Sequence, residues 1–216
     1  MNHHPAWPRP RGLLLDAMGT LIGLRQSVGE GYAAVAADQG LALDAAAIDR
    51  EFPALYRQAP PLAFPGLEGR ALRQAETDWW GALIAAVLQR IGAAPPPAEL
   101  TAALFDHYSR AEAWRVYDDV PRHLRRWHAA GLKLAVVSNF DGRLPALLEH
   151  LGLAQWLDAV VISSTAGAAK PDPAPFRQAL CCLGLPARQV WHVGDSPEDV
   201  AGARAAGLAC VCVRRP

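Results

Sequence analysis

The sequence predicts an α/β fold in which a parallel sheet is interrupted, just after its first strand, by a helical insert. Two observations lead to this class. In the second half of the chain, short apolar runs alternate with helical patterns, which is typical of parallel strands covered by helices on both faces. Between residues 24 and 116, by contrast, the patterns are helical and contain no convincing strand. The 216 residues are enough for one large domain or two modest ones.

Five apolar runs are the predicted strands, at residues 12–16, 132–138, 159–163, 190–194 and 208–213. They are rich in Val and Ile and show little alternation of apolar and polar residues, which fits strands buried on both faces. The helical patterns between the later runs cover residues 120–130, 142–151, 174–184 and 197–206. We therefore expect an α/β core domain formed by residues 11–23 and 117–216, preceded by a loose, Pro-rich lead-in at residues 1–10.

The helical insert, residues 24–116, has signals for several helices. Asp44 is placed to N-cap a helix that runs through Tyr56, and Pro97 lies near the first turn of another. Within residues 69–91, apolar side chains recur at spacings of three and four, as one face of a helix requires: Leu72, Ala75, Trp79, Leu83, Val87 and Ile91. Aromatic residues at such spacing belong more often to a core than to a substrate platform, so we expect Trp79, Trp80 and Trp114 to be core residues.

Composition narrows the choice of partners and location. Hydrophobic residues make up 51% and charged residues 19%, which is typical of a soluble globular protein. Lys plus Arg and Asp plus Glu number 21 each, so charge gives no argument for nucleic acid or a membrane surface. No apolar run is long enough to span a membrane, and the N-terminus lacks the apolar segment of a signal peptide. The four cysteines, with no C-x-x-C, fit buried thiols in a reducing cytoplasm.

Polar residues that could carry out chemistry lie at the ends of the first two predicted strands, residues 12–16 and 132–138. Asp16 ends the first strand, in LLLDAMGTL, and Thr20 follows in the turn. A carboxylate at such a place could attack phosphorus or carbon, although a strand-ending Asp in a turn is at least as common. Ser138 and Asn139 end the second strand, where a hydroxyl and backbone N–H groups could hold a phosphate oxygen.

Two further positions follow later strands. Lys170, in AAKPDPAPF, could neutralise a nucleophilic carboxylate together with the group transferred to it. Asp195 ends a strand and Asp199 lies four residues later, so the two carboxylates, beside Asp16, could hold Mg²⁺. A simpler interpretation explains part of this pattern, because Ser196 could N-cap the next helix with Asp199 in its first turn. That interpretation leaves Asp195 unexplained.

Each motif alone is weak, but their order along the chain is informative. Because ligands bind beyond the carboxyl ends of the strands in an open parallel sheet, all four motifs are expected at one edge of the sheet. LLLDAMGTL, VVSNFDGRL, AAKPDPAPF and HVGDSPEDVAGARAAG resemble, in order, the four motifs of the haloacid dehalogenase-like superfamily. The resemblance covers nearly the whole chain. It implies a Rossmann-like core whose helical insert, residues 24–116, is a cap of type 1.

The resemblance also implies roles for the matching residues. Asp16 would be the nucleophile, with its backbone carbonyl near the metal, and Lys170 would pair with it. Ser138 and Lys170 would contact the phosphoryl group. Asp16, Asp195 and Asp199 would carry Mg²⁺.

Four other residues complete the expected site. Thr20 is grouped with the catalytic residues, and Gly19, Asn139 and Arg25 with substrate binding, Arg25 through a carboxylate of the substrate. A hinge-surface location is an equal alternative for Arg25.

One residue departs from the pattern. The phosphatases of this superfamily have an Asp at position 18, which protonates the leaving oxygen and then deprotonates water, and Met18 can do neither. A positioned general acid/base is typically worth about 10² to 10⁴ in rate, or roughly 3–5 kcal/mol. Acyl or aryl phosphates, which leave without a proton, would suffer least. Glu30, Glu68, Asp118 and His192 are possible substitutes, and the sequence does not choose among them.

The leading hypothesis is a Mg²⁺-dependent phosphatase that acts on a small phosphorylated metabolite through an aspartyl-phosphate intermediate. One alternative is carbon–halogen hydrolysis through an ester of Asp16 without metal, because DAMGTL resembles the DAYGTL of haloacid dehalogenases. The other is a non-catalytic binding protein, for which Met18 is the motivation. The sequence predicts neither the substrate nor the oligomeric state.

Overall fold

A five-stranded parallel sheet forms the centre of the computed structural model, which describes residues 9–215. The strands lie in the order β5-β4-β1-β6-β7. Their bounds are Gly12–Leu15 (β1), Lys133–Ser138 (β4), Ala159–Ile162 (β5), Val190–Gly194 (β6) and Ala209–Cys212 (β7). All five predicted strands are therefore confirmed to within one residue at each end, and so is the α/β class. β1 lies between β4 and β6, so the residues that follow these three strands meet at one edge.

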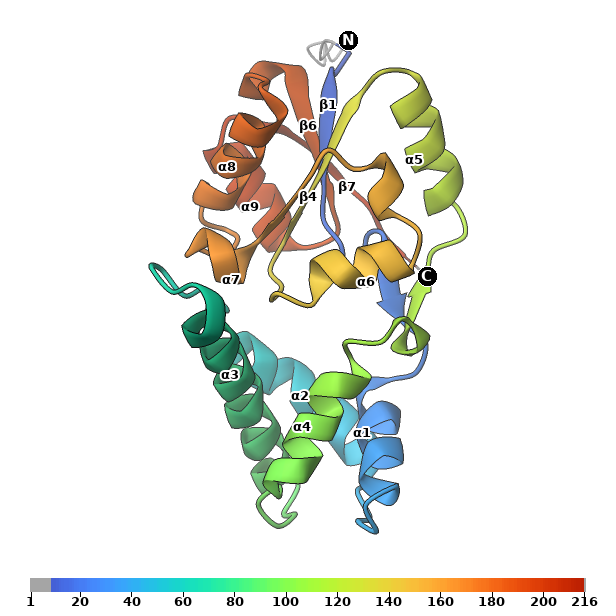
Figure 1. Ribbon diagram of the computed structural model, residues 1–216, viewed down its shortest axis with the longest axis vertical. Helices are drawn as coiled ribbons and strands as arrows, with labels where there is room; N and C mark the ends of the chain where they lie inside the picture. Colours follow the sequence, from blue (N-terminus) through green and yellow to red (C-terminus); the bar gives the residue numbers. More distant parts are fainter. Residues whose placement is uncertain (1–8, 216) are drawn as a thin grey trace, which may run out of the picture.

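Helices cover both faces of the sheet, as Figure 1 shows. They are α5 (Val120–Ala129), α6 (Leu144–His150), α7 (Ser163–Ala166), α8 (Ala174–Leu183) and α9 (Pro197–Ala205), with short 3₁₀ turns at Ala111–Ala113, Ala154–Trp156 and Ala187–Gln189. The alternation of side chains along β1 shows the two layers. Leu13 and Leu15 pack into the same cluster as Leu124 of α5, whereas Leu14 packs with Phe176 of α8. Both faces of the central strand are thus buried.

Four helices make up the predicted insert: α1 (Val28–Ala37), α2 (Ala45–Gln58), α3 (Gly69–Arg90) and α4 (Ala98–His107). Asp44 caps α2 by accepting a hydrogen bond from the N–H of Ala47, as predicted, and Pro97 is the N-cap of α4. Leu72, Leu83 and Val87 are buried on α3, but the buried face also includes Glu76, which the sequence pattern did not indicate. These helices pack around their own apolar cluster, separate from the two clusters that flank the sheet.

A short antiparallel ribbon joins the insert to the sheet. It consists of β2 (Ile22–Leu24) and β3 (Trp114–Val116), which pair with each other and not with the main sheet. The expectation that residues 24–116 contain no strand is wrong at β3. Three residues are too few for a visible alternation, and the ribbon forms only because the two ends of the insert return to the same place.

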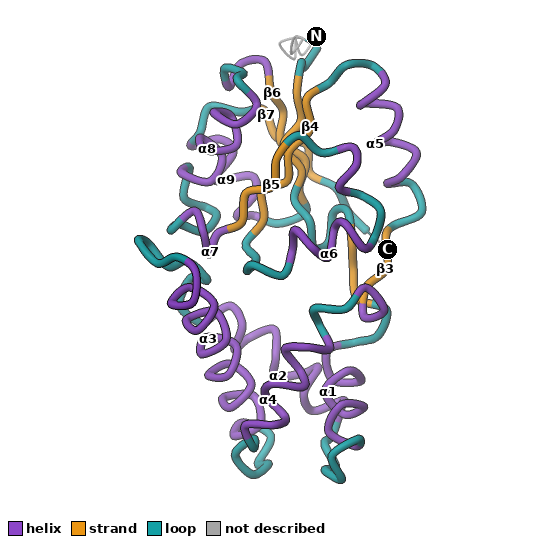
Figure 2. The backbone as a smooth tube through the Cα atoms, in the orientation of Figure 1, coloured by secondary structure: helices purple, strands orange, loops and turns teal. Residues whose placement is uncertain are grey.

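Figure 2 shows α1–α4 grouped beyond the carboxyl edge of the sheet, with the ribbon as the connection. On this arrangement we propose the division into a core, residues 11–23 and 117–216, and a cap, residues 24–116. Most of the lead-in at residues 1–10 lies outside the described residues. Within residues 9–215, none of the helices combines the length and the apolar character needed to cross a bilayer.

The cap is docked onto the core through polar contacts around α3. The carboxylate of Glu76, which is buried, accepts a hydrogen bond of 2.9 Å from the backbone N–H of Gly142. Trp80 Nε1 donates to Asp141 Oδ2 at 2.7 Å. The loop that connects α2 to α3 reaches the core at Ser163, whose hydroxyl donates to a cap backbone carbonyl at 2.6 Å. The structure is therefore a closed form, in which the cap covers the carboxyl edge of the sheet.

Candidate active site

Asp16 directly follows β1 and is the centre of a buried polar cluster. Its Oδ1 accepts hydrogen bonds from Lys170 Nζ at 2.6 Å and from Ser138 Oγ at 3.1 Å. The side chains of all three residues are almost fully buried. Among the described residues no hydrogen-bond partner is found for Oδ2 of Asp16. One carboxylate oxygen is thus fixed by the protein, and the other is left for a ligand.

Lys170 is held in place from both ends. Its backbone N–H donates to Asn139 Oδ1 at 2.7 Å, and its carbonyl accepts from Asn139 Nδ2 at 2.9 Å. Its ammonium group donates to Asp16 Oδ1 and to Asp199 Oδ1, both at 2.6 Å. Burial on its own would lower the pKa of Lys170, but the charges of Asp16 and Asp199 outweigh it and raise the pKa, so the lysine is positively charged at neutral pH.

Asp199 has every acceptor position of its carboxylate in use. Oδ1 accepts from Lys170 and lies 2.8 Å from His192 Nε2, and Oδ2 accepts from the backbone N–H and the hydroxyl of Ser196 at 3.1 and 2.7 Å. A carboxylate offers about four lone-pair positions, so these contacts fill them. Burial would raise the pKa of Asp199, but the hydrogen bond with His192 and the charge of Lys170 hold it well below the usual value. Asp199 is therefore an anion that positions the lysine.

The same contacts confirm the simpler interpretation of this segment. Ser196 is the N-cap of α9, and its hydroxyl accepts from the N–H of Asp199 at 3.1 Å, which completes a capping box. Asp199 thus caps the helix and holds Lys170 at the same time. The two interpretations that the sequence left open are compatible.

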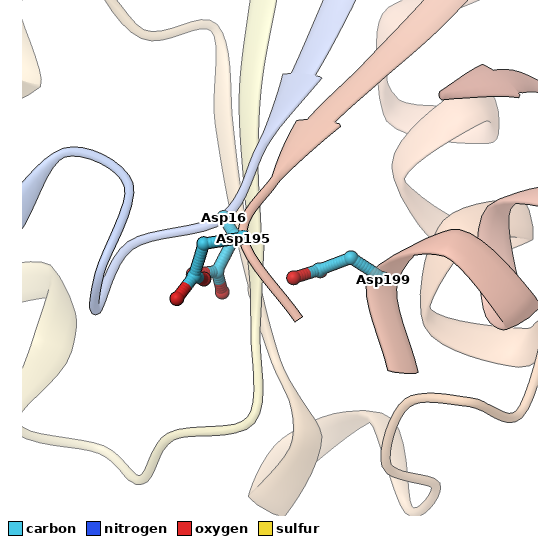
Figure 3. Close-up of side chains that lie close together, drawn as sticks. All are labelled: Asp16, Asp195 and Asp199. Atoms are coloured by element: carbon cyan, nitrogen blue, oxygen red, sulfur yellow. The ribbon is translucent and has the colours of Figure 1, made fainter. Parts of the chain in front are cut away.

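Asp195, at the end of β6, has a different environment from Asp199. Asp195 is exposed, but partial desolvation together with the negative charges of Asp16 and Asp199 raises its pKa. Its carboxylate lies beside that of Asp16, with Asp199 pointing toward the pair from α9 (Figure 3). One oxygen from each of the three carboxylates lies within 4.8 Å of the others. Three carboxylates thus face one ammonium group, and this excess of negative charge fits a divalent cation with oxygen ligands.

Gly19 and Thr20 support Asp195 from the turn after Asp16. A Cβ at Gly19 would lie 2.3 Å from Asp195 Oδ2, and the φ of Gly19 is +82°, so both space and backbone conformation require glycine. Thr20 Oγ1 donates a long hydrogen bond, 3.4 Å, to Asp195 Oδ1. Both residues contact the acidic cluster.

Asn139 and Arg25 were both expected to bind substrate. Both polar atoms of the Asn139 amide form hydrogen bonds with the backbone of Lys170, so this side chain holds Lys170 in place. Arg25 is exposed and lines a separate hollow of about 380 Å³ with residues of the cap and hinge such as Ser27 and His107. The structure does not bring Arg25 into the cluster around Asp16.

Met18 lines a second cavity, of about 370 Å³, between the cap and the core. Trp114 is buried in a core cluster, as expected, and Trp79 and Trp80 are partly buried against another, but Trp80 and Trp114 also line this cavity. Trp79, in contrast, donates its Nε1 to the carbonyl of Pro60 and is not among the lining residues. The apolar periodicity of residues 69–91 includes Trp79 and not Trp80, but it does not predict which ring faces the cavity, because this depends on how α3 is rotated against the core.

Two of the possible substitutes for an acid at position 18 are engaged elsewhere. His192 is fully buried on β6, contacts Asp199 and is not among the lining residues of the cavity. Glu30 accepts from the backbone of Ser27 in the capping box of α1. The sequence singled out His192 only as a possible proton donor, whereas the structure places it against Asp199.

Comparison with known proteins identifies the class to which this fold and site belong, which is that of the hydrolases. A family model described as haloacid dehalogenase-like hydrolase matches residues 10–207, and the chain belongs to this family. The predicted family is thereby confirmed.

Individual relatives extend this result. The chain is 38% identical to haloacid dehalogenase-like hydrolase domain-containing protein 3 of Danio rerio over 187 residues, which cover 86% of this chain and 76% of that protein. It is 38% identical to a phosphoserine phosphatase of Thermus thermophilus over 134 residues, 59% of this chain and 51% of that protein. The crystal structure of L-2-haloacid dehalogenase from Xanthobacter autotrophicus has a TM-score of 0.69, 22% identity, and coverage of 94% and 77%. This structural likeness shows the fold.

Proposed function

We propose that the chain is a Mg²⁺-dependent phosphatase that acts on a small phosphorylated molecule through a phosphoryl group carried by Asp16. Asp16 Oδ2 attacks phosphorus, the bond between phosphorus and the ester oxygen breaks, and that oxygen leaves with the electron pair. Water then attacks the phosphorus of the aspartyl phosphate, which releases inorganic phosphate and restores the carboxylate. The relatives that are phosphatases support this reaction class.

One observation carries the proposal: Asp16 has one oxygen fixed by Lys170 and Ser138 and the other open, at the edge of the sheet beside Asp195. The positive charge of Lys170 stabilises the carboxylate and, in the transition state, the phosphoryl oxygens beside it. Ser138 fixes the rotamer of Asp16 and so aims Oδ2 away from the protein.

Asp16 and Asp195 are the residues that would hold Mg²⁺. When bound, Mg²⁺ would supply positive charge to the phosphoryl oxygens during transfer. Asp199 belongs to the same acidic group, but its four acceptor positions are filled, so we assign it to positioning Lys170 and not to direct coordination. Burial, followed by the negative charges of Asp16 and Asp199, raises the pKa of Asp195, and a bound cation would offset the repulsion between these carboxylates.

Exchange of the nucleophile tests this function. We expect Asp16→Asn to lower the turnover of every hydrolysed ester in a panel of phosphate monoesters by at least about 10³-fold, and EDTA to abolish wild-type turnover. Asp158→Asn, which removes a carboxylate far from the site, is the matched control and keeps the activity. Unchanged turnover in Asp16→Asn would refute the assignment of the nucleophile. EDTA-resistant release of chloride from 2-chloropropionate would instead establish carbon–halogen hydrolysis.

A further inference from the structure

The cavity between cap and core has a lining of unusual character for a site beside a phosphoryl-transfer cluster. It measures about 370 Å³, within the range of small-molecule sites. Aromatic rings from several elements surround it, among them Tyr32, Phe52, Trp80, Phe105, Trp114 and Phe140. Rings of this kind favour a flat apolar ligand, because they offer both apolar area and edge-to-face or stacked contacts.

The cavity adjoins the proposed nucleophile. Met18, two residues after Asp16, forms part of its wall, and so does Asn139, which follows Ser138 and clamps the backbone of Lys170. A phosphoryl group at the open oxygen of Asp16 would therefore place its ester substituent in the cavity. The substituent would be the leaving group of the reaction.

Most polar groups of the lining are already used inside the protein, and the exceptions among the described residues are the hydroxyls of Tyr32 and Tyr56 and the exposed Arg57. Trp80 Nε1 donates to Asp141, and Trp114 Nε1 donates to the carbonyl of Tyr108 at 3.1 Å. The guanidinium of Arg143 is bound by both oxygens of Asp141, at 2.8 and 2.6 Å, and by the carbonyl of Phe105. Its charge is thus neutralised by a fully buried carboxylate.

A sugar or other polyol in this cavity would lose many hydrogen bonds to water and regain few, because Tyr32 and Tyr56 offer the only uncommitted hydroxyls among the described lining residues, and this is unfavourable. An apolar ring loses nothing of this kind. Four residues of the lining are exposed, namely Met18, Pro53, Tyr56 and Arg57, so the cavity is open to solvent on the side where these residues lie.

The lining also lacks an effective proton donor among the described residues. Met18 has no acidic group, and burial raises the pKa of all three tyrosines of the lining, Tyr32, Tyr56 and Tyr108, above the ordinary value. A catalytic acid is most effective when its pKa is near the working pH, so none of these tyrosines meets this condition. A leaving group that departs as a stable anion, such as a phenolate, needs no donor.

We propose that this cavity binds an aromatic, largely apolar leaving group, so that the substrates are phosphate monoesters of phenol-like alcohols. The inference rests on the proposed phosphatase function and specifies its substrate class. Apolarity and acidity of the alcohol are separate requirements: the rings and the paired polar groups determine the first, and Met18 determines the second.

A matched pair of esters separates apolarity from leaving-group acidity. 2-Naphthyl phosphate and O-phosphotyrosine both release a phenol-type oxygen, but only phosphotyrosine carries a charged, strongly hydrated tail. We expect kcat/KM to be at least about tenfold higher for the naphthyl ester, and glucose 6-phosphate to be slower than both. Equal values for the two aryl esters, or preference for glucose 6-phosphate, would overturn the proposal.

Two adjacent tryptophans provide a matched pair of variants. Trp80→Leu removes a ring from the cavity, and Trp79→Leu removes a ring of similar exposure from the same helix outside it. We expect Trp80→Leu to lower the naphthyl-to-phosphotyrosine ratio of kcat/KM about tenfold and Trp79→Leu to leave this ratio within twofold. If both variants changed the ratio equally, the cavity would not be the site that selects the leaving group.

A binding measurement on the wild-type protein keeps this inference distinct from the proposed function. 2-Naphthylmethylphosphonate and methylphosphonate are not hydrolysed, and their dissociation constants follow from quenching of tryptophan fluorescence or from the shift in Tm. We expect the naphthyl compound to bind at least tenfold more tightly. If no ester is hydrolysed but this difference is found, the function fails and the cavity assignment stands. Equal binding would refute the cavity assignment, whatever the activity.

Discussion

Met18 lies on the wall of the apolar cavity, two residues after the carboxylate that we propose as the nucleophile. Its side chain is 41% exposed, so a different side chain fits there without repacking of the core. The turn around it is fixed independently, by Gly19 at positive φ and by hydrogen bonds from Thr20, Leu21 and Ile22 to the carbonyl of Ala17. Position 18 can therefore vary in chemistry while the loop keeps its shape.

An acid at this position is expected to restore the missing proton transfer. We predict that Met18→Asp raises the turnover of alkyl phosphates by about 10²-fold or more and of aryl phosphates much less, because only the alkoxide needs a proton. The measurement is the dependence of kcat on the pKa of the leaving alcohol, which becomes flatter in the variant. Met18→Asn is the control of equal size without the acid. If Met18→Asn had the same effect, proton donation would be the wrong explanation.

Residue-level contacts also separate residues that look alike in sequence. Asp195 and Asp199 belong to one motif, yet the pKa is raised in the first and lowered in the second. The difference arises because Lys170 and His192 face Asp199, whereas the neighbours of Asp195 are mainly other carboxylates. The four-residue spacing between Asp195 and Asp199 does not predict that their pKa values shift in opposite directions.

At the scale of elements, α3 and the loop after β4 connect the cap to the core. Glu76 of α3 and Gly142 of the loop form one contact, and the indole of Trp80 with Asp141 forms another. Arg143 adds to them, because its guanidinium lies 3.9 Å from the ring centre of Phe105 in the cap. The same loop follows directly on Ser138 and Asn139 of the site. One short segment therefore both contacts the cap and positions residues around Asp16.

Loss of the Glu76 carboxylate is expected to loosen the cap. A hydrogen bond to a charged group contributes about 1.5–3 kcal/mol, so Glu76→Ala should increase the population of the open form roughly ten- to a hundredfold. Hydrogen exchange of the Gly142 amide, followed by mass spectrometry or NMR, measures this directly.

Two controls accompany this experiment. Glu76→Gln keeps an acceptor oxygen and should give a smaller effect, and Asp78→Ala, on an exposed face of the same helix, should give none. Unchanged exchange at Gly142 in Glu76→Ala would show that other contacts hold the cap closed.

For the whole molecule, the acidic cluster links metal, pH and stability. Burial, together with the charges of Asp16 and Asp199, raises the pKa of Asp195 above its unfolded value of about 3.9, and the ammonium of Lys170 offsets only part of this. Because its folded pKa is the higher one, the Asp195 carboxyl stabilises the folded protein when it is protonated. This contribution to the free energy of unfolding is fully present below the unfolded pKa and is lost as pH rises through the folded pKa. Without a divalent cation, ionised Asp195 is therefore a destabilising group at neutral pH.

Mg²⁺ should reverse this loss. At a concentration 100 times its dissociation constant, a ligand stabilises the folded state by about 2.7 kcal/mol, so we expect Mg²⁺ to raise Tm by several degrees at pH 7 and much less near pH 4, where protons compete. Asp195→Asn should raise Tm without Mg²⁺ and remove the Mg²⁺-dependent shift. Differential scanning calorimetry measures both effects. A Mg²⁺ shift of equal size in Asp195→Asn would place the cation elsewhere.

The sequence by itself determined much of this protein. The five strands, the position of the helical insert and the order of the four motifs were all predicted, because parallel strands buried on both faces are apolar runs and because their carboxyl ends share one edge. That same rule brought Asp16, Ser138, Lys170 and Asp195 into one predicted site. Local signals such as the capping residues Asp44 and Ser196 were also legible, since an N-cap acts within a single turn.

Only the tertiary structure decided what the site's surroundings are. The ribbon at Trp114–Val116, the buried Glu76, the rotation of α3 that turns Trp80 and not Trp79 into the cavity, and the use of Asn139 to hold Lys170 all depend on contacts between distant segments. The apolar periodicity of a helix predicts which of its faces is buried, but it does not predict which other element that face packs against. Packing of the cap on the core supplies that partner, and with it the apolar cavity on which the substrate proposal depends.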